Sequence, residues 1–560
     1  MNLKRQRRNH LMLGGLAIVS SLAIFATSAH ANVYATNLKL NGGTTNVVLP
    51  RGGSVEISYL LNEPASSGVT VKILSGANVV CSLAIPPNSE GAYRGQNTLF
   101  WGGTNNFGNR VSGGTYSVSI TAASSGYSQW TQITSDQGDP YTYVYEGRSI
   151  SVNRNTNSPF YGRIFVANAN IGPDPQTPGD VLGILKFNAD GSAADDGITT
   201  GGSDGHEWSG GGVSPFKVEV STDDYVYVSD LANRGEVYRW DPTFSTNSLL
   251  SVLSTNNLAA DSWLSGLAVV GTGTNTQIFM AGTNATNSGV FRWKVTGTGA
   301  CASNDLGMLV VGSVTNIADV ALDKNGNLYV CSSVSAVGDP APRVFRFRAY
   351  DPSTNGGAPA LVADWAVGAT NDAYGDATGI AVDPTGTYVA VSFLGVDDFG
   401  LTVKGNTKVL YATNGALVTE IDLEQPMNGL PYTQHLDTDC AWDAVGNLYY
   451  VDWFYGKWRA VSPPGTNHST TVAFPTIQIS TSGEIVPPTI SKISISGNTV
   501  TIDFSAGDTD AASNFTLQSS ASPAGTYAAA SGASITQVSP GSFRATVPVN
   551  GGSQFYRIRR

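Results

Sequence analysis

The chain is poor in charge, histidine and cysteine. Only 13% of its 560 residues are Asp, Glu, Lys or Arg, about half of the ~25% usual in soluble proteins. This composition argues against a coiled coil and against a large disordered region. Its five histidines and four cysteines offer little for a multi-histidine or zinc centre. Glycine, with 64 residues, and hydrophobic residues, at 41%, are plentiful, which indicates an ordered, turn-rich protein of three or four domains.

Common nucleotide-binding and metalloprotease motifs are absent. The Gly-rich stretch 201–212, which contains His206, lacks the Lys-Ser/Thr of a P-loop and the glycine spacing of a dinucleotide-binding fold. No His-Glu-x-x-His and no Cys-x-x-Cys occurs. Cys331 and Cys440 lie in apolar strand patterns, which favours buried thiols. The spacing of these two cysteines with Cys81 and Cys301 identifies no disulfide.

Residues 1–31 have the pattern of a secretory signal peptide. Four basic residues within 4–8 precede the apolar stretch 11–25, and small residues at 29–31 allow cleavage. The apolar stretch is short for the ~20 residues of a membrane span, so we expect a mature chain from Asn32 with no transmembrane span. This chain would carry 27 basic and 42 acidic residues, a net charge of −15, which disfavours nucleic acid as a partner. We expect a secreted protein, extracellular, at the bacterial cell surface or in the periplasm.

Residues 32–122 alternate apolar and polar side chains in short runs. The clearest runs are 55–59, 69–74 and 116–120, and Gly, Asn or Pro residues lie between them. A period of two predicts half-buried antiparallel strands. About 90 residues of this kind predict a β-sandwich, and residues 123–147 are expected to form a linker.

The second half of this segment resembles the Ig-like domain of the flagellar hook-capping protein. The residues that carry the resemblance are Trp101, Gly103, Gly108, Val111, Gly114, Tyr116, Val118, Ile120 and Ala122. Because the resemblance covers this segment alone, a flagellar role is not implied for the whole chain. It implies a spacer or assembly module on an exported protein.

One pattern recurs six times between residues 148 and 478. In its clearest copies a short apolar strand leads into Asp-x-x-Gly, with Asp at 323, 383 and 443, and a second strand then ends in a small or polar residue. These ends recur every 50–62 residues. Asp or Asn with Gly between two strands predicts a tight hairpin, since Gly accepts a positive φ without strain. We assign Asp323-Lys-Asn-Gly326, which superficially suggests a calcium loop, to the same turn.

Six units of several strands each favour a six-bladed β-propeller over a row of sandwiches. The stretch 225–240, with Asp230, Asn233 and Val237, resembles an NHL-type repeat, and this resemblance supports the propeller without identifying a ligand. The fold class expected for the chain is therefore all-β. It would combine an Ig-like sandwich at 32–122, a six-bladed propeller at 148–478 and a small C-terminal sandwich at 491–560.

In a propeller, the loops after each second strand and before each first strand lie on one face. Polar and aromatic residues there would form a rim that holds a glycan, peptide or protein by stacking and hydrogen bonding. The candidate ligand-binding residues are Asn168, Trp208, Asp230, Trp263, Ser332, Ser392, His435, Asp437, Asp439, Asp452 and Trp453. The alternative is that these side chains cap the strands and bond to loop backbone.

Four acids of this set, Asp230, Asp437, Asp439 and Asp452, are also candidate metal ligands, because Ca²⁺ prefers oxygen donors. The segment from His435 to Asp439 has the densest mixture of carboxylate and imidazole. Alternate residues of a strand share one face, so these groups would converge on a cation or orient His435 as a base. A solvated loop is the alternative. No catalytic residue is identified, and calcium is the one candidate cofactor.

The C-terminal residues form a further unit. Pro487-Pro488 marks a linker within 479–490, and strand-length runs follow at 493–495, 500–504 and 543–547. The segment resembles fibronectin type III and related C-terminal modules of large secreted bacterial proteins. This resemblance implies a passive sandwich or a surface-binding module.

Three functions fit these features. The first is a secreted multidomain binding or scaffold protein whose propeller rim holds an extracellular protein or glycan. The second is a propeller hydrolase or lyase acting on a glycan or lactone with help from calcium, and the third is a structural component of the cell envelope. Carboxylates converging in an open central pocket would favour metal binding or catalysis, whereas a plugged channel with dispersed acids would favour binding.

Overall fold

The computed structural model describes residues 32–560 except 51, 175, 201–203, 260, 283–287, 334–341, 369–375, 395–405, 422–435, 473–475, 480–486, 509 and 550. The expected signal peptide and His435 lie outside the described residues. Every described element longer than three residues is a β-strand, which confirms the all-β class. The short 3-10 turns are η1 (Pro140–Thr142), η2 (Pro178–Asp180), η3 (Leu231–Asn233), η4 (Thr246–Ser248), η5 (Thr255–Asn257), η6 (Gly273–Asn275), η7 (Pro352–Thr354) and η8 (Ala512–Asn514).

Two sheets around one core form the unit that we call the N-terminal sandwich. Its first sheet has the order β1 (Ala35–Leu40), β3 (Val55–Leu61), β6 (Gly95–Trp101). Its second sheet has the order β2 (Val47–Leu49), β32 (Ile477–Ile479), β7 (Gly114–Tyr127), β4 (Gly68–Ser75), β5 (Asn78–Ile85), and β31 (Gly465–Val472) also pairs with β7. The alternating runs of the sequence place Ile57, Val71 and Val118 in the core between the sheets.

Six further sheets follow along the chain, each a meander of antiparallel strands. The first three are β9 (Gly147–Val152), β10 (Ile164–Asn168), β11 (Gly183–Phe187); β12 (Val218–Val220), β13 (Val226–Asp230), β14 (Glu236–Trp240), β15 (Leu250–Leu253); and β16 (Leu264–Val270), β17 (Gln277–Gly282), β18 (Gly289–Lys294), β19 (Met308–Val311). The next two are β20 (Ile317–Leu322), β21 (Leu328–Ser332), β22 (Val344–Phe347), β23 (Trp365–Val367); and β24 (Asp376–Val382), β25 (Tyr388–Leu394), β26 (Thr407–Tyr411), β27 (Leu417–Ile421). The sixth is β28 (Asp437–Trp442), β29 (Leu448–Asp452), β30 (Lys457–Ser462), β8 (Thr131–Gln132).

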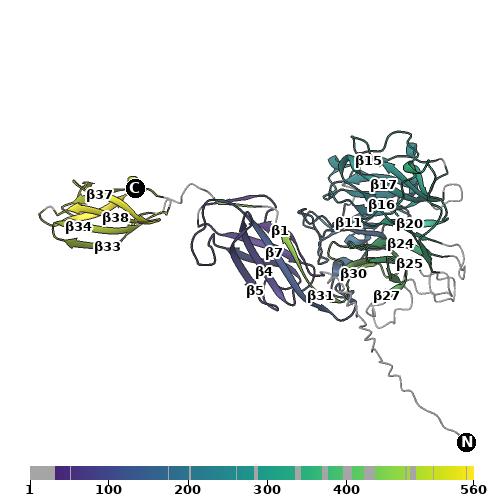
Figure 1. The fold of residues 1–560 in the computed structure, drawn as a ribbon, viewed down its shortest axis with the longest axis horizontal. Coiled ribbons are helices and arrows are strands. Elements are labelled where there is room, and N and C mark those ends of the chain that lie inside the picture. Colours follow the sequence, from purple (N-terminus) through teal and green to yellow (C-terminus); the bar gives the residue numbers. More distant parts are fainter. Residues whose placement is uncertain are drawn as a thin grey trace, which may run out of the picture.

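These six sheets are arranged around one axis. The first strand of each sheet contacts the first strand of the next, from β9 through β12, β16, β20 and β24 to β28, and β28 contacts β9. The contacts therefore close on themselves, and we call this unit the six-sheet ring (Figure 1). Buried aliphatic and aromatic clusters fill the spaces between neighbouring sheets.

The Asp-x-x-Gly hairpins have the turn geometry expected of them. The Asp323 carboxylate accepts hydrogen bonds from the backbone N–H groups of Asn325 at 2.8 Å and Asn327 at 3.0 Å. Asp443 accepts the equivalent bonds from Val445 and Asn447. The aspartate thus satisfies donors that a tight turn leaves unpaired, which explains its recurrence between the first and second strands.

Two unit boundaries differ from those expected. The residues Thr131–Gln132, which fall in the expected linker, pair with β30 and complete the sixth sheet. The residues 465–479, expected to end the propeller, instead form β31 and β32 and pair with β7. The ring is consequently inserted between β7 and β31 of the N-terminal sandwich, and β31 lies as a light green strand beside the purple strands in Figure 1.

The N-terminal sandwich packs firmly against the ring. Tyr34 and Leu60 of the sandwich form one buried cluster with Tyr161 and Ala189 of the ring. The Asn447 side chain of the β28–β29 hairpin donates a 2.8 Å hydrogen bond to the Asn32 carbonyl. Burial of polar and aromatic groups across this junction indicates a fixed orientation of the two units.

The third unit, which we call the C-terminal sandwich, also has two sheets. The first has the order β33 (Thr489–Ser496), β34 (Thr499–Ser505), β38 (Ser542–Pro548), β37 (Ser534–Ser539), and the second has the order β36 (Ala528–Ala529), β35 (Thr516–Ser520), β39 (Phe555–Arg559). Three phenylalanines in mutual contact, Phe504, Phe515 and Phe543, form the centre of its core. In Figure 1 this unit lies at the end of the molecule opposite the ring.

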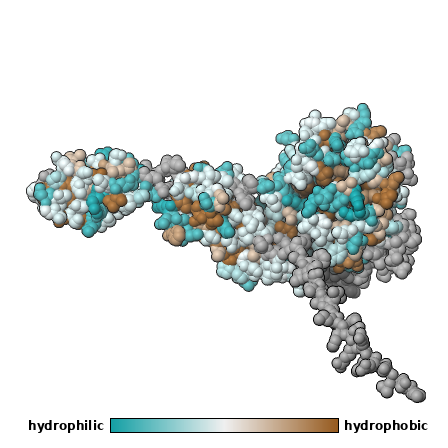
Figure 2. Space-filling model, in the orientation of Figure 1, coloured by the Kyte–Doolittle hydropathy of each residue, from teal (hydrophilic) through white to brown (hydrophobic). Residues whose placement is uncertain are grey.

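The visible surface is of mixed polarity, and the cysteines are buried. Figure 2 shows hydrophilic and hydrophobic residues interspersed over all three units on the face in view. All four cysteines are buried free thiols, as the apolar patterns around Cys331 and Cys440 indicate. None of the helical segments in the described part of the chain has the length and hydropathy needed to cross a membrane.

The insertion predicts that β32 stabilises a sandwich more than 300 residues away in sequence. Ile477 is fully buried in the N-terminal core, so Ile477→Ala should lower the free energy of unfolding of that sandwich by about 2–5 kcal/mol. Hydrogen exchange of the β7 amides measures the loss. Val48→Ala is the control, since Val48 is 71% exposed and its truncation should cost less than about 0.5 kcal/mol. Equal effects of the two substitutions would contradict the assignment of β32 to this core.

Candidate functional site

The first strand of nearly every ring sheet has the same irregularity near its start. In five of the six sheets the pairing register shifts by one residue there, which is a β-bulge. The bulges of three sheets present hydroxyl side chains to the next sheet. Ser265 donates to the Ala318 carbonyl at 3.1 Å, Thr378 to the Asp437 carbonyl at 3.1 Å, and Thr438 to the Gly147 carbonyl at 2.9 Å.

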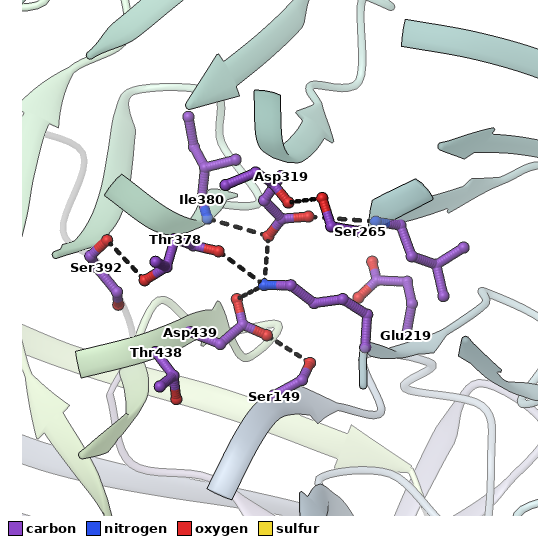
Figure 3. A network of polar contacts seen from close by, with 12 residues as sticks. Ser149, Glu219, Ser265, Asp319, Thr378, Ile380, Ser392, Thr438 and Asp439 are labelled. Carbon is purple, nitrogen blue, oxygen red and sulfur yellow. Dashed lines mark hydrogen bonds and ion pairs between the residues drawn. The ribbon is translucent and has the colours of Figure 1, made fainter. Parts of the chain in front are cut away.

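A buried lysine lies at the centre of the ring. The Lys217 ammonium donates to Asp319 Oδ2 at 2.9 Å, to Asp439 Oδ1 at 2.9 Å and to the Thr378 carbonyl at 3.0 Å (Figure 3). Its three donors are therefore all used. Asp439 also accepts hydrogen bonds from the Ser149 hydroxyl and, at 3.3 Å, from the Ile150 amide.

The partners of Asp319 complete a network that includes all six sheets. Asp319 Oδ1 accepts from the Leu267 amide at 3.2 Å, and Oδ2 accepts from the Ile380 amide at 3.3 Å as well as from Lys217. Residues of β9, β16, β20, β24 and β28 thus meet around a lysine that directly precedes β12. We call Lys217, Asp319 and Asp439 the central triad.

Burial dominates the electrostatics of the central triad. Lys217 is 3% exposed and each aspartate 4%, so none of the charges is screened by water. Burial, together with the nearby Asp439 charge, raises the pKa of Asp319 to about 6 although Lys217 opposes the shift. The two carboxylates keep the pKa of Lys217 above its ordinary value despite burial. One ammonium between two carboxylates thus remains charged, and it compensates most of their cost of burial.

A cavity of about 80 Å³ lies between the first strands of the six sheets and is lined by their residues. It contains the central triad together with Glu219 and Ser151. Glu219 accepts a 3.2 Å hydrogen bond from the Ser151 hydroxyl, and burial raises the pKa of Glu219 to about 7. The ion pairs of the triad lie across this channel and join its walls (Figure 3).

Three of the predicted rim residues form structural hydrogen bonds. Asn168 is fully buried, accepts from the Glu146 amide and donates to the carbonyls of Gly179 and Val181. The Ser332 hydroxyl donates to the Thr315 carbonyl at 2.8 Å. Ser392 is fully buried and shares a 2.9 Å hydrogen bond with the Thr407 hydroxyl.

The predicted acids bind different partners, although Asp437 and Asp452 lie opposite one another in the β28–β29 pair. Asp439 belongs to the central triad, whereas Asp452 forms a fully buried ion pair with Arg459 at 3.0 Å. Asp437 accepts a 2.7 Å hydrogen bond from the Thr407 hydroxyl. Asp230 caps η3 by accepting from Asn233. Burial opposes ionisation of Asp230, but its interactions with His206, Ser214 and Asn233 together lower its pKa.

Among the described residues, no group of three or more His, Cys, Asp or Glu side chains is placed to hold a metal ion. Asp439 forms an ion pair with Lys217, and Asp452 forms one with Arg459, so a basic side chain already neutralises each carboxylate. Calcium binding therefore remains a prediction from the sequence, and no cluster of ligands among the described residues supports it.

The aromatic candidates differ in exposure. Trp208 is nearly buried, donates from its indole N–H to Asp204 at 3.0 Å, and packs edge-on against His206. Trp263 is 48% exposed. Trp453, which directly follows β29, lies under the Arg148 guanidinium at 5.5 Å.

A polar and aromatic surface surrounds Trp453 where the first and sixth sheets meet. Glu146 binds Arg148 at 2.6 Å and the Asn170 amide at 3.0 Å, so Asn170, Glu146, Arg148 and Trp453 form a continuous chain of contacts. The adjoining segments are held together by backbone hydrogen bonds from Val144 to Gly456 and from Tyr145 to Gly179. The exposed apolar side chains of these segments, which we call the rim patch, are Tyr141, Tyr145, Ile171 and Phe454.

Sequence analysis missed the central triad except for Asp439, and it missed the rim patch. A signal for the triad does exist in the repeats. Asp319 and Asp439 each stand four residues before the aspartate of an Asp-x-x-Gly turn. The corresponding position of the other repeats holds Ser149, Lys217, Gly266 and Gly379, so one repeat position supplies the whole inner layer of the ring.

Comparisons with known proteins give distant structural similarity alone. No protein-family profile and no curated protein matches the chain. A calcium structure of a carbohydrate-active enzyme of family AA12 from Trichoderma reesei superposes with a TM-score of 0.37 and 13% identity, covering 61% of this chain and 97% of the other. A complex of KlAtg21 with the coiled coil of AgAtg16 gives a TM-score of 0.30 and 12% identity, covering 64% and 94%. Function must therefore be argued from the site itself.

The central triad predicts a strong and pH-dependent effect of removing its cation. Lys217→Met leaves two buried carboxylates without a counter-charge and should lower the free energy of unfolding by about 3–5 kcal/mol at pH 7. Without the ammonium, the folded-state pKa of Asp319, which burial already raises to about 6, would rise further, so the loss should shrink as the pH falls towards 4 and Asp319 becomes protonated. Urea unfolding followed by tryptophan fluorescence measures both effects.

Two comparisons make this result specific. Adding Asp319→Asn and Asp439→Asn to Lys217→Met should restore part of the lost stability, because no buried charge then remains in the triad. Lys324→Met, on the exposed β20–β21 hairpin, should change the stability by less than about 0.5 kcal/mol. A pH-independent loss, or no recovery in the triple variant, would refute the electrostatic account.

The inner layer also predicts a steric effect at Gly379. A Cβ atom there would lie 2.5 Å from Asp439 Cα and 2.5 Å from its Oδ1, so Gly379→Ala must displace the triad. We expect a loss of about 1–3 kcal/mol in the same unfolding measurement. Gly297→Ala is the control, because a Cβ at Gly297 has no neighbour within 4 Å. Equal stability of the two variants would contradict this packing.

Proposed function

We propose that the six-sheet ring is a six-bladed β-propeller and that it presents a ligand-binding rim on an exported binding or scaffold protein. The closed series of contacts among the first strands supports the propeller. The insertion of the ring into the N-terminal sandwich supports a scaffold role, because it fixes the ring relative to a second unit.

The observation that carries this proposal is the contrast between buried charges and exposed aromatic side chains. The predicted acids Asp230, Asp439 and Asp452 are buried in structural hydrogen bonds or ion pairs. Phe454, by contrast, is 49% exposed and Tyr145 39% exposed. Exposed rings near hydrogen-bonding groups suit binding through stacking and hydrogen bonds.

The chemistry of the rim patch favours a glycan. Sugar rings present C–H faces that stack on aromatic side chains, and hydroxyl edges that bond to charged and amide groups. The contact chain Asn170, Glu146, Arg148 and Trp453 supplies both acceptors and donors beside Phe454. A peptide or a protein surface with aromatic and polar groups is the alternative ligand of the same site.

A propeller hydrolase would require a pair of carboxylates that substrate can reach. Carboxylates that come together in the described residues are bound to buried cations, as Asp319 and Asp439 are to Lys217, and Asp136 and Asp452 to Arg459. This arrangement supports the binding proposal over hydrolysis. Export, proposed from the pattern of residues 1–31, would bring the rim patch to extracellular or cell-surface polymers.

The proposal predicts that the rim patch determines ligand affinity. The mature chain should bind on a glycan array, and Phe454→Ala and Tyr145→Ala should each weaken binding of the best glycan about tenfold in isothermal titration calorimetry. Phe107→Ala is the matched control, since Phe107 is 87% exposed on the N-terminal sandwich and its removal should leave the affinity unchanged. Binding on a peptide array but not on the glycan array would identify the ligand of the rim patch as a peptide and not a glycan. The absence of binding on both arrays, or release of reducing ends from a bound glycan, would refute the proposal.

A further inference from the structure

The two sheets of the C-terminal sandwich do not cover one another completely. Strand β35 of the three-stranded sheet contacts β37 of the four-stranded sheet. Both residues of β36 are exposed, whereas Tyr556 and Ile558 of β39 pack against the core. Since β37 is the edge strand farthest from β33, we infer that β39 lies on the side of β35 that faces β33. Both β33 and β39 are edge strands of their sheets.

Strand β33 carries apolar side chains on the core face. Ile493 pairs with Ile502 and Ile495 pairs with Val500, and residues directly opposite one another in an antiparallel pair share a face. Ile502 is fully buried and Val500 is 4% exposed, yet Ile493 is 54% and Ile495 68% exposed. Two isoleucines therefore extend the core beyond the part that the second sheet covers.

The edge next to this uncovered core is open. Strand β39 pairs with β35 on one side, and no other described strand pairs with it. Its inward residues Tyr556 and Ile558 belong to the core, whereas Phe555, Arg557 and Arg559 are exposed on the outer face. The free N–H and C=O groups of such an edge can bond to an added strand.

We propose that the C-terminal sandwich binds an extended segment of another polypeptide, which adds to β39 as a further strand and covers Ile493 and Ile495. The segment would carry apolar residues at alternate positions, facing Ile493, Ile495 and Ile558. It would carry acidic residues at the positions between them, opposite Arg557 and Arg559. Main-chain hydrogen bonds would supply affinity and the alternating side chains would supply specificity.

Charge decides between an acidic partner and a second copy of this chain. Two β39 strands side by side would bring their exposed arginines together, and like charges directly opposite destabilise a pair of strands. Acidic side chains at the same positions would instead form ion pairs with Arg557 and Arg559. The arginines thus hinder self-association and leave the edge open to an acidic strand.

The chain closes another of its sheets in a comparable way. In the N-terminal sandwich, β31 and β32 arrive from beyond the ring, pair with β7 and bury Ile477 and Ile479 completely. Isoleucines on such an added strand become part of the core. In the C-terminal sandwich the isoleucines are already in place on β33, and the proposed segment would bury them from the opposite side.

The test uses the mature chain and a fluorescent peptide of about nine residues that alternates valine and glutamate. Fluorescence anisotropy should show saturable binding, at least about tenfold weaker for the matched peptide that alternates valine and lysine. Hydrogen exchange should slow in β39 when the valine–glutamate peptide is bound. The double variant Ile493→Ser, Ile495→Ser should weaken binding at least about tenfold, and it should fold normally because both side chains are exposed.

Val48→Ser is the matched control, since Val48 is 71% exposed on the N-terminal sandwich and its replacement should leave peptide binding unchanged. Equal binding of the two peptides, or binding that the double variant retains, would overturn the proposal. A concentration-dependent dimer of the wild-type chain that the double variant loses would also overturn it, in favour of a second copy. The rim variant Phe454→Ala should leave peptide binding intact, so this proposal and the rim proposal can fail separately.

Discussion

The ammonium group of Lys217, held between the carboxylates of Asp319 and Asp439, is the interaction on which the ring depends. It links residues 222 positions apart in the chain, and its partners reach all six sheets through backbone amides and hydroxyls. A buried ion pair of this kind adds little net stability compared with a well-packed apolar core, but its disruption is costly. We therefore expect the triad to destabilise other arrangements of the six sheets, in which its charges would be unpaired, more than it stabilises the observed arrangement.

The packing around the triad follows from the same constraint. Six first strands that meet on one axis bring their backbones close together, and large side chains at every inner position would not fit. The repeats alternate accordingly: Gly266 and Gly379 leave room for Asp319 and Asp439, and a Cβ on either glycine would lie within 2.6 Å of an aspartate Cα atom. Each of the two aspartates lies where a glycine of a neighbouring sheet leaves room for it. Hydroxyl side chains in the bulges donate hydrogen bonds to backbone carbonyl groups of the next sheet.

Local features of the fold could be predicted from the sequence because their causes are local. The aspartate of each Asp-x-x-Gly turn bonds to amides within four residues, so its recurrence identified the hairpins. Alternation of apolar residues likewise identified the strands of both sandwiches. The unit boundaries could not be predicted in this way, because β31 is polar, β8 has only two residues, and their partners lie more than 300 residues away.

The candidate site was harder to predict for the same reason. The polar residues near the ends of the second strands could be located in the repeats, but their burial depends on partners in other segments, such as Thr407 for Ser392. Lys217 stood out in no motif, since its role appears only when equivalent repeat positions are compared. The rim patch carries no periodic signal, because it is assembled from the lead-in segment 140–146, the loop after β10 and the turn after β29.

Exposure of apolar side chains has opposite meanings in different parts of this molecule. An isolated exposed residue such as Phe107 projects from a loop, and its exposure needs no explanation. Ile493 and Ile495 are different, because their cross-strand partners are buried and the strand that bears them belongs to a core sheet. Exposure on the core face means that a covering element is not among the described strands. Since β39 offers an open edge at the same place, the uncovered core and the unpaired backbone would both be satisfied by a single added strand.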